Sequence, residues 1–194
     1  MNLNNESIEV FLNNFGKIHT DHQFWINASS DKEPLVNVLT LHLMSENFLE
    51  AYICFKLNIS NLFDTEIRKE NGEEYKKEAL KLQFNQKLKF SQILGLPQEV
   101  CEFFEKLNRL RNKFAHDLNV QPIDNSFIES LINIVNRLEP DSEQFNTQCE
   151  QITFLDKNGK QTQFIFNDEN TPNTIRLTLL YAFLIRKFII KLCK

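Results

Sequence analysis

The sequence has few residues that break secondary structure, with four glycines and five prolines among 194 residues. It also lacks an apolar run long enough to cross a bilayer. Its hydrophobic C-terminal segment has nine residues without a charge, 177–185, whereas a spanning helix needs roughly 20. The first ten residues have neither the basic nor the apolar region of a secretory signal. We therefore expect a helical, cytoplasmic protein that does not enter a membrane.

Closely spaced cysteines are also missing. The four thiols stand far apart in the chain, at Cys54, Cys101, Cys149 and Cys193. This spacing indicates neither a zinc site nor a disulfide framework, so we expect inert thiols in a reducing compartment. His42 and Glu46 are four residues apart and share a helix face, but a metal pair there would lack a third ligand. We expect no metal and no cofactor.

The chain has no overall excess of positive charge. Its net charge is −4, which excludes a protein that coats nucleic acid by bulk charge. The charges are unevenly distributed, however. Residues 76–118 contain nine lysines and arginines against five acidic residues, and residues 176–194 contain five against none. A local basic surface on an acidic protein favours a site for one RNA segment. The alternative is a set of solvated helix faces.

Helical periodicity between the glycines and prolines predicts most of the secondary structure. The expected helices are 6–15, 35–62, 79–94, 97 to about 117, 125–138 and 173–193. Gly16 is expected to end the first helix, residues 17–33 to form a loop that carries Trp25, and residues 64–78 to form an exposed connection. Residues 151–155 and 161–166 are β-rich, and Asn158-Gly159 between them is a strong hairpin signal. The expected fold class is all-α: one domain over residues 1–194, an antiparallel up-and-down bundle of five or more helices with a β-hairpin before the C-terminal helix.

The helix that begins at Pro97 has two contrasting faces. Four apolar residues recur with helical spacing and form one stripe: Phe103, Leu107, Leu110 and Phe114. Four polar residues lie almost opposite this stripe: Glu105, Arg109, Asn112 and His116. Arg111 lies on the flank, nearer the apolar stripe. One face therefore supports the fold, and the other offers groups that can hold a phosphate.

Within this helix, the pattern Arg111-Asn112 followed by His116 resembles the signature of the HEPN superfamily. The string LNRLRNKFAHDL at residues 107–118, preceded by LKFSQILGLP, resembles the branch related to the mannitol operon repressor and to abortive-infection proteins. The resemblance covers about residues 35–138. The hairpin near 151–166 and the helix near 173–193 form an extension beyond it.

The resemblance implies a metal-independent endoribonuclease of the toxin or phage-defence type. In this family two such helices face each other across a two-fold homodimer and build one composite cleft. By resemblance, Arg111 and His116 carry the chemistry, and Asn112 orients His116 or binds phosphate. Histidine suits proton transfer near neutral pH, and the planar arginine fork suits phosphate. Arg109, Lys113 and Glu46 are candidate supporting or RNA-binding residues, and a cognate antitoxin or regulatory protein is a further expected partner.

Several alternatives remain open at this stage. Arg109 also satisfies the family's looser spacing to His116, so either arginine is a candidate for the phosphate. The polar residues could instead cap the helix or pair with acidic neighbours such as Glu46. Some relatives of the repressor type act as non-catalytic regulatory or RNA-binding modules. Related toxins often have a tyrosine two residues after the histidine, where an antitoxin attaches AMP. Here that residue is Leu118, which excludes this form of control.

Overall fold

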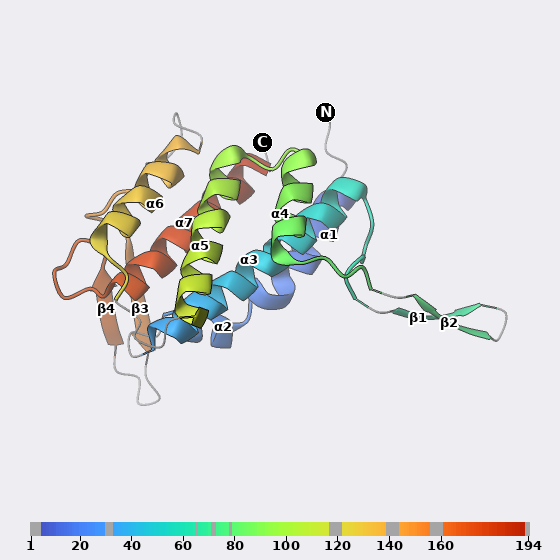
Figure 1. Ribbon diagram of the computed structural model, residues 1–194, viewed down its shortest axis with the longest axis horizontal. Coiled ribbons are helices and arrows are strands. Elements are labelled where there is room, and N and C mark those ends of the chain that lie inside the picture. The colour runs from blue at the N-terminus through green and yellow to red at the C-terminus, as the bar shows by residue number, and fades with distance from the viewer. Residues whose placement is uncertain are drawn as a thin grey trace. The chain divides into compact units, whose positions relative to one another are not determined.

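The computed structural model describes residues 5–29, 33–64, 66–70, 73–77, 79–116, 122–138, 144–155 and 161–192. These ranges form seven helices and two antiparallel two-stranded hairpins (Figure 1). The helices are α1 (Asn5–His19), α2 (His22–Ala28), α3 (Pro34–Leu57), α4 (Phe84–Ile93), α5 (Gln98–His116), α6 (Asn125–Arg137) and α7 (Asn173–Leu192). The strands are β1 (Glu66–Glu70), β2 (Glu73–Lys77), β3 (Gln151–Leu155) and β4 (Gln161–Ile165). The prediction of a mostly helical chain with a hairpin before the last helix is confirmed.

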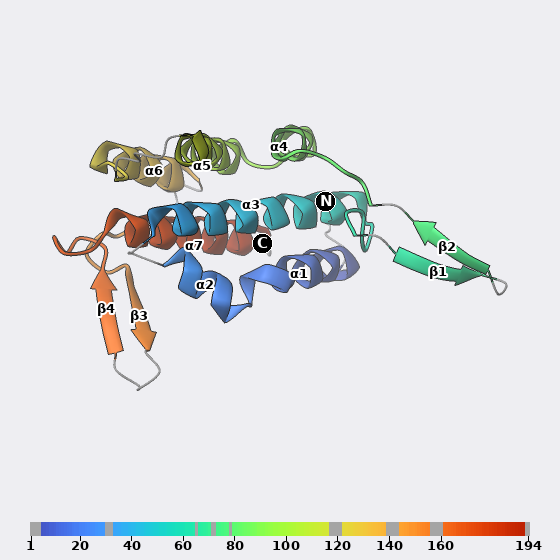
Figure 2. The same cartoon turned by 60° about the horizontal axis from the view of Figure 1, so that its bottom comes forward.

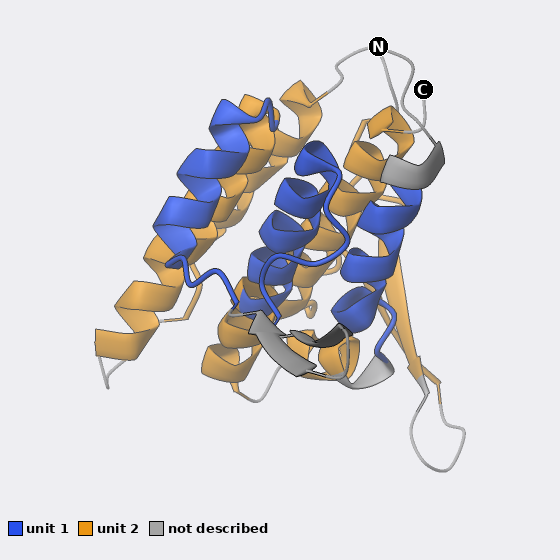
Figure 3. Cartoon of the chain, turned by 90° about the vertical axis from the view of Figure 1, so that its right-hand side faces the viewer, with its two compact units in different colours: residues 1–22, 43–96 blue, residues 23–42, 97–194 orange. Residues whose placement is uncertain are grey.

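The chain divides into two compact units (Figure 3). Unit 1 contains residues 1–22 and 43–96, and unit 2 contains residues 23–42 and 97–194. The long helix α3 contributes to both, since the boundary falls between His42 and Leu43. The expected single HEPN-like domain over residues 1–194 stays a prediction.

In unit 1, the second part of α3 packs between α1 and α4 (Figure 2). Aromatic rings join α1 to α3, with Phe11 in edge contact with Phe48 and Phe55 at centroid distances of 5.8 and 6.0 Å. On the other side, the Tyr52 hydroxyl donates to the Leu94 carbonyl just after α4, at 3.3 Å. These contacts bury large side chains of α3 on both sides.

In unit 2, α5 and α6 lie side by side on one side of α7 (Figures 1 and 2). The ring of Tyr181 on α7 lies 6.4 Å from Phe103 and 6.3 Å from Phe104, which fixes the buried face of α5. Trp25 on α2 lies 6.3 Å from the same tyrosine ring. Lys187 on α7 donates to the Val135 carbonyl of α6 at 3.1 Å.

The predicted end of the first helix at Gly16 and the predicted loop over residues 17–33 were wrong. Gly16 lies inside α1, and residues 22–28 form α2 instead of a loop. A glycine inside a helix costs about 1 kcal/mol relative to alanine. The next turn compensates for this cost because it buries His19, whose ring stacks on Phe15 at a centroid distance of 3.8 Å. Packing therefore extends α1 beyond the glycine.

Residues 64–78 were expected to form an exposed connection, but they contain the hairpin β1–β2. The register pairs Glu66 with Lys77 and Glu70 with Glu73. The two strand sequences, EIRKE and EEYKK, have almost no apolar residues, so the period-two alternation of a half-buried strand is missing. The second hairpin, β3–β4, falls where it was expected and pairs Ile152 with Phe164. The predicted Asn158-Gly159 turn lies outside the described residues.

Helix α5 starts at a sharp break in the chain. Gly95 follows α4 with φ +91°, a left-handed conformation that favours glycine. The Pro97 carbonyl then accepts from the amides of Val100 and Cys101, which forms the first turn of α5.

Among the described residues, no helix is both long and apolar enough to cross a membrane.

Candidate functional site on α5

The amphipathic pattern of α5 is present in three dimensions. The apolar stripe is buried, with Phe103 and Leu107 at 0% exposure, Phe114 at 5% and Leu110 at 9%. The residues expected on the opposite face are all exposed: Glu105, Arg109, Asn112 and His116. The expected division of the helix into a buried face and a solvent-facing polar face is confirmed.

His116 is the last residue of α5, and its side chain is exposed. The two other histidines whose side chains are described are buried. His19 contacts the Phe15 carbonyl, and burial lowers its pKa to about 4. His42 shares a hydrogen bond of 3.0 Å between its Nε2 and Asn108 Oδ1. Among these three, His116 has the access to solvent that a proton-transfer group requires.

Arg111 is half-buried on the flank of α5. Its Nη1 donates to Asn112 Oδ1 at 3.1 Å, and its Nε is buried with no hydrogen-bond partner among the described residues. A guanidinium has five N–H donors, so three remain on its outer end for an anion. Asn112 therefore contacts the arginine of the motif. No hydrogen bond joins Asn112 to His116 in the described part of the chain.

Arg109 differs from Arg111 in its surroundings. Its side chain is 80% exposed and forms a 3.8 Å ion pair with Glu105, one turn earlier. Exposed pairs of this kind contribute less than about 1 kcal/mol and yield readily to a better anion. On an ideal helix Arg109 lies within about 20° of His116, whereas Arg111 lies about 140° from it. Arg109 thus lies on the same face of α5 as His116. Arg111 lies on another side of the helix and contacts that face by its hydrogen bond to Asn112.

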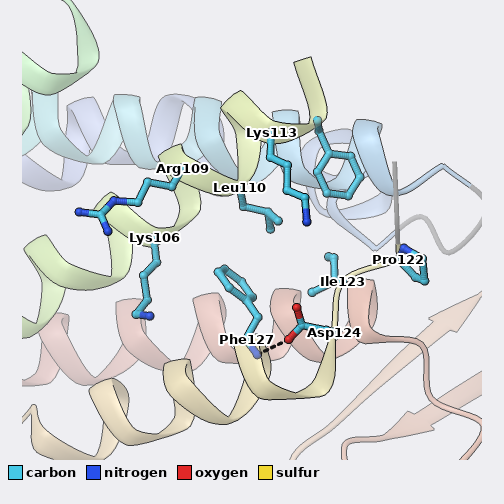
Figure 4. Close-up of a pocket in the computed structure, with 9 residues that line it drawn as sticks. Lys106, Arg109, Leu110, Lys113, Pro122, Ile123, Asp124 and Phe127 are labelled. Carbon is cyan, nitrogen blue, oxygen red and sulfur yellow. Dashed lines mark hydrogen bonds between the residues drawn. The ribbon is translucent and has the colours of Figure 1, made fainter. Parts of the chain in front are cut away.

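Beside this face lies a cleft between α5 and α6, here called the α5–α6 groove (Figure 4). It has a volume of about 280 Å³. Three cations of α5 line it: Lys106, Arg109 and Lys113. Apolar side chains form its walls: Leu110, Phe114, Pro122, Ile123 and Phe127. Figure 4 shows Lys106 and Lys113 extending from α5 toward α6, with Arg109 at the edge of the group.

One carboxylate, Asp124, also lines the groove. It caps the N-terminus of α6, where its Oδ1 accepts from the Phe127 amide at 2.7 Å and from the Ser126 hydroxyl at 2.6 Å. The Ser126 and Phe127 hydrogen bonds, helped by the charge of Lys113, hold the pKa of Asp124 below its usual value. Among the described residues that line the groove, three cations against one capping carboxylate give a positive charge.

Glu46 belongs to unit 1 and has a partner there. Lys87 on α4 donates to Glu46 Oε1 at 2.6 Å and to Glu50 Oε1 at 2.5 Å. Arg109, which could pair with Glu46 or with Glu105 on the sequence alone, forms its ion pair with Glu105. A supporting role for Glu46 in the site stays a prediction.

The described residues contain no cluster of three or more metal-ligating side chains. Burial raises the pKa of the Cys54 thiol, and it is the main reason that the pKa of the Cys101 thiol is raised to about 11. Neither thiol forms a nucleophilic thiolate near neutral pH.

Sequence reasoning identified the polar face of α5 but missed four residues of the groove: Lys106, Ile123, Asp124 and Phe127. Lys106 stands three residues before Arg109 and seven before Lys113, a spacing that places the three cations along one flank of a helix. That signal was available in the sequence. Phe127 could not be found in the same way, because its place depends on how α6 packs against α5.

Comparisons of the chain with protein-family models, with curated proteins and with solved structures find no match. The HEPN resemblance therefore depends on the residues of the motif and on the helix that carries them.

Proposed function

We propose that the chain is a metal-independent endoribonuclease of the toxin or phage-defence type, with an HEPN-like site on the exposed face of α5. One observation carries the proposal. An exposed histidine ends an amphipathic helix whose same face presents Arg109 and Asn112, directly beside a positively charged groove. This combination supplies a proton-transfer group and phosphate-binding groups without a metal.

The chemistry is attack of a ribose 2′-hydroxyl on the adjacent phosphorus. A base takes the 2′-hydroxyl proton as the 2′-oxygen bonds to phosphorus, and an acid protonates the 5′-oxygen as its bond to phosphorus breaks. The products are a 2′,3′-cyclic phosphate and a 5′-hydroxyl. His116 is the group for proton transfer. The outer N–H donors of Arg111, held by Asn112, stabilise the charge on the phosphorane.

The reaction needs both a base and an acid, and one chain offers one exposed histidine among the described side chains. We therefore expect a two-fold homodimer in which His116 of both copies faces one cleft. Static light scattering at micromolar concentration should give about twice the monomer mass of 22.9 kDa. A monomer at that concentration, or a dimer whose His116 residues lie on its outer surface, contradicts a composite site.

Cleavage is expected to continue in the presence of EDTA, because none of the proposed steps requires a metal ion. The measurement is the rate of cleavage of a labelled single-stranded RNA after dialysis against the chelator, with a magnesium-dependent nuclease as the control for complete removal. Full inhibition by EDTA that added magnesium reverses would reject the mechanism.

A non-catalytic RNA-binding or regulatory module is the second candidate. The α5–α6 groove favours it, since three cations and an apolar wall can hold RNA without any proton transfer. The described residues also provide no hydrogen-bonded partner for His116. In such a module RNA binds at the groove and leaves unchanged, and a substitution of His116 affects affinity or assembly alone.

A further inference from the structure

We propose that the α5–α6 groove binds one unstacked nucleotide of a single-stranded RNA, with its base against Phe127 and the flanking phosphates along Lys106, Arg109 and Lys113. This inference rests on the proposed function for the identity of the polymer. It adds a subsite beyond Arg111, Asn112 and His116, built from the row of cations on α5 and from Phe127 of α6.

The size of the groove sets the first limit on its occupant. Pockets that enclose a whole drug-sized ligand have volumes of roughly 300–1,000 Å³, and the groove is smaller at about 280 Å³. It therefore suits one unit of a polymer, with the rest of the chain continuing over the surface.

The cations set the second limit. Lys106, Arg109 and Lys113 stand at helical spacing i, i+3 and i+7, so the row extends about 10 Å along α5. A single phosphate can contact one part of such a row, whereas a strand that carries a charge on every unit can contact all of it. Asp124 offsets only part of the charge of this row, because it is one carboxylate against three cations and its Oδ1 already accepts from Ser126 and Phe127. The ligand is therefore a polyanion.

The apolar wall sets the third limit. Phe127 is half-buried, and its backbone amide is bound by Asp124, which fixes the first turn of α6 beside the groove. Figure 4 shows its side chain between Lys106 and the carboxylate of Asp124. Ile123, 6% exposed, supports the wall from the same side. An aromatic side chain next to a row of cations is the usual platform for an unstacked base.

The groove also lies close to the proposed chemistry. Lys113 precedes His116 by three residues, which is about 4.5 Å along the axis of α5. A strand whose phosphates follow the row from Lys106 to Lys113 therefore continues toward His116. The subsite would hold a nucleotide next to the scissile bond and set which bases are accepted there.

The test uses the His116→Ala variant as the parent, so that cleavage does not interfere with binding. Fluorescence anisotropy measures the affinity of a 5′-fluorescein-labelled single-stranded 12-nucleotide RNA over a series of salt concentrations. Adding Lys106→Gln and Lys113→Gln together should weaken binding and reduce the slope of log affinity against log salt by about 1.4, or 0.7 for each lost phosphate contact. Lys89→Gln on α4, an exposed lysine of unit 1, is the matched control and should change neither quantity.

Adding Phe127→Ala to the same parent should weaken binding roughly 5- to 150-fold, the range for loss of one base-stacking contact, and should leave the salt slope unchanged. Phe127→Leu keeps the apolar packing but removes the ring. It should therefore lose affinity without a fall in thermal stability, and Phe127→Trp should retain affinity. A duplex RNA of equal length and free AMP should both compete poorly, because the first hides its bases and the second lacks the flanking phosphates.

Three results would overturn the inference: Phe127→Leu binding as tightly as the parent with its fold intact, an unchanged salt slope in the double lysine variant, or AMP competing as well as the strand. Its failure is separable from that of the proposed function. Wild-type cleavage that is unaffected by the groove substitutions rejects the subsite alone. Groove-dependent binding by a wild-type protein that leaves every RNA intact supports the subsite and rejects catalysis.

Discussion

Replacing His116 with alanine is expected to lower the rate of RNA cleavage by roughly 10²–10⁴-fold, the contribution of a positioned proton-transfer group. RNA affinity should remain almost unchanged, since the proposed phosphate contacts come from the arginines and the lysines of α5 and not from His116. His116 is exposed at the end of α5, so its truncation leaves no cavity in the core and should not alter stability. Cleavage and binding of a labelled single-stranded RNA, measured on both proteins, give the two quantities separately.

The wild type and the His116→Ala variant should also differ in their effect on bacterial growth. Expression of the wild type in a bacterial host should arrest growth, and expression of His116→Ala should not. If the wild type is harmless in cells and leaves varied RNAs uncut, the regulatory or RNA-binding function becomes the better conclusion.

The two arginines provide the matched comparison for the histidine. Arg111→Ala should reduce both rate and affinity, because a charge-assisted phosphate contact acts in the ground state and in the transition state. Arg109→Ala removes the same charge from the same helix. It should cost affinity more than rate, since Arg109 lines the groove. A larger loss of rate for Arg109→Ala would identify Arg109 as the motif arginine.

Most of the helical elements, though not α2, and the polar face of α5 could be predicted because both follow from periodicity within one segment. The buried stripe from Phe103 to Phe114 and the exposed stripe that ends at His116 depend on helix geometry alone. The end of α1 could not be predicted, because the helix continues beyond Gly16 through a packing contact, the buried stacking of His19 on Phe15. The low helix propensity of glycine, read from the sequence alone, takes no account of that contact.

The rest of the site could not be predicted because it depends on contacts between distant segments. Phe127 belongs to α6, and it lies beside the cations of α5 only because the two helices pack against each other. Asn112 was expected to orient His116 or bind phosphate, since either use fits its place on the helix. The structure places its Oδ1 on Arg111, a choice that depends on side-chain conformation, and its role toward His116 or a phosphate stays a prediction.

Replacing Lys87 with methionine is expected to destabilise unit 1 by about 2–4 kcal/mol. The lysine side chain is 7% exposed, and the carboxylates of Glu46 and Glu50 that bind it are each 28% exposed. Breaking a fully buried pair by removing one partner costs roughly 3–5 kcal/mol. The partial exposure of the carboxylates reduces this cost, whereas their mutual repulsion, one turn apart on α3, adds to it.

Urea unfolding of the wild type and Lys87→Met, followed by circular dichroism, measures the loss. The control variant adds Glu46→Gln and Glu50→Gln to Lys87→Met, which removes all three charges. It should recover most of the stability, because the cost comes from uncompensated carboxylates. If the triple variant is as unstable as Lys87→Met, the loss comes from packing around the lysine stem.

Glu46→Gln alone separates the two roles considered for Glu46. If its role is to hold Lys87, the variant should lose stability and cleave RNA at the wild-type rate at temperatures where it remains folded. A fall in cleavage rate without a change in the unfolding midpoint would instead support the predicted role in the site.

The stabilisation by Lys87 should also depend on pH in a defined direction. Burial acts to lower the pKa of Lys87, but the hydrogen bonds and charges of Glu46 and Glu50 outweigh it and raise that pKa above the ordinary value of 10.5. The unfolded chain therefore loses this proton at a lower pH than the folded chain does. The stabilisation is fully present below about pH 10 and decreases as the pH rises through the raised pKa. Thermal unfolding from pH 7 to 11 should accordingly show a steeper alkaline loss of stability for the wild type than for Lys87→Met, and equal slopes would show that the ion pairs contribute no net stability.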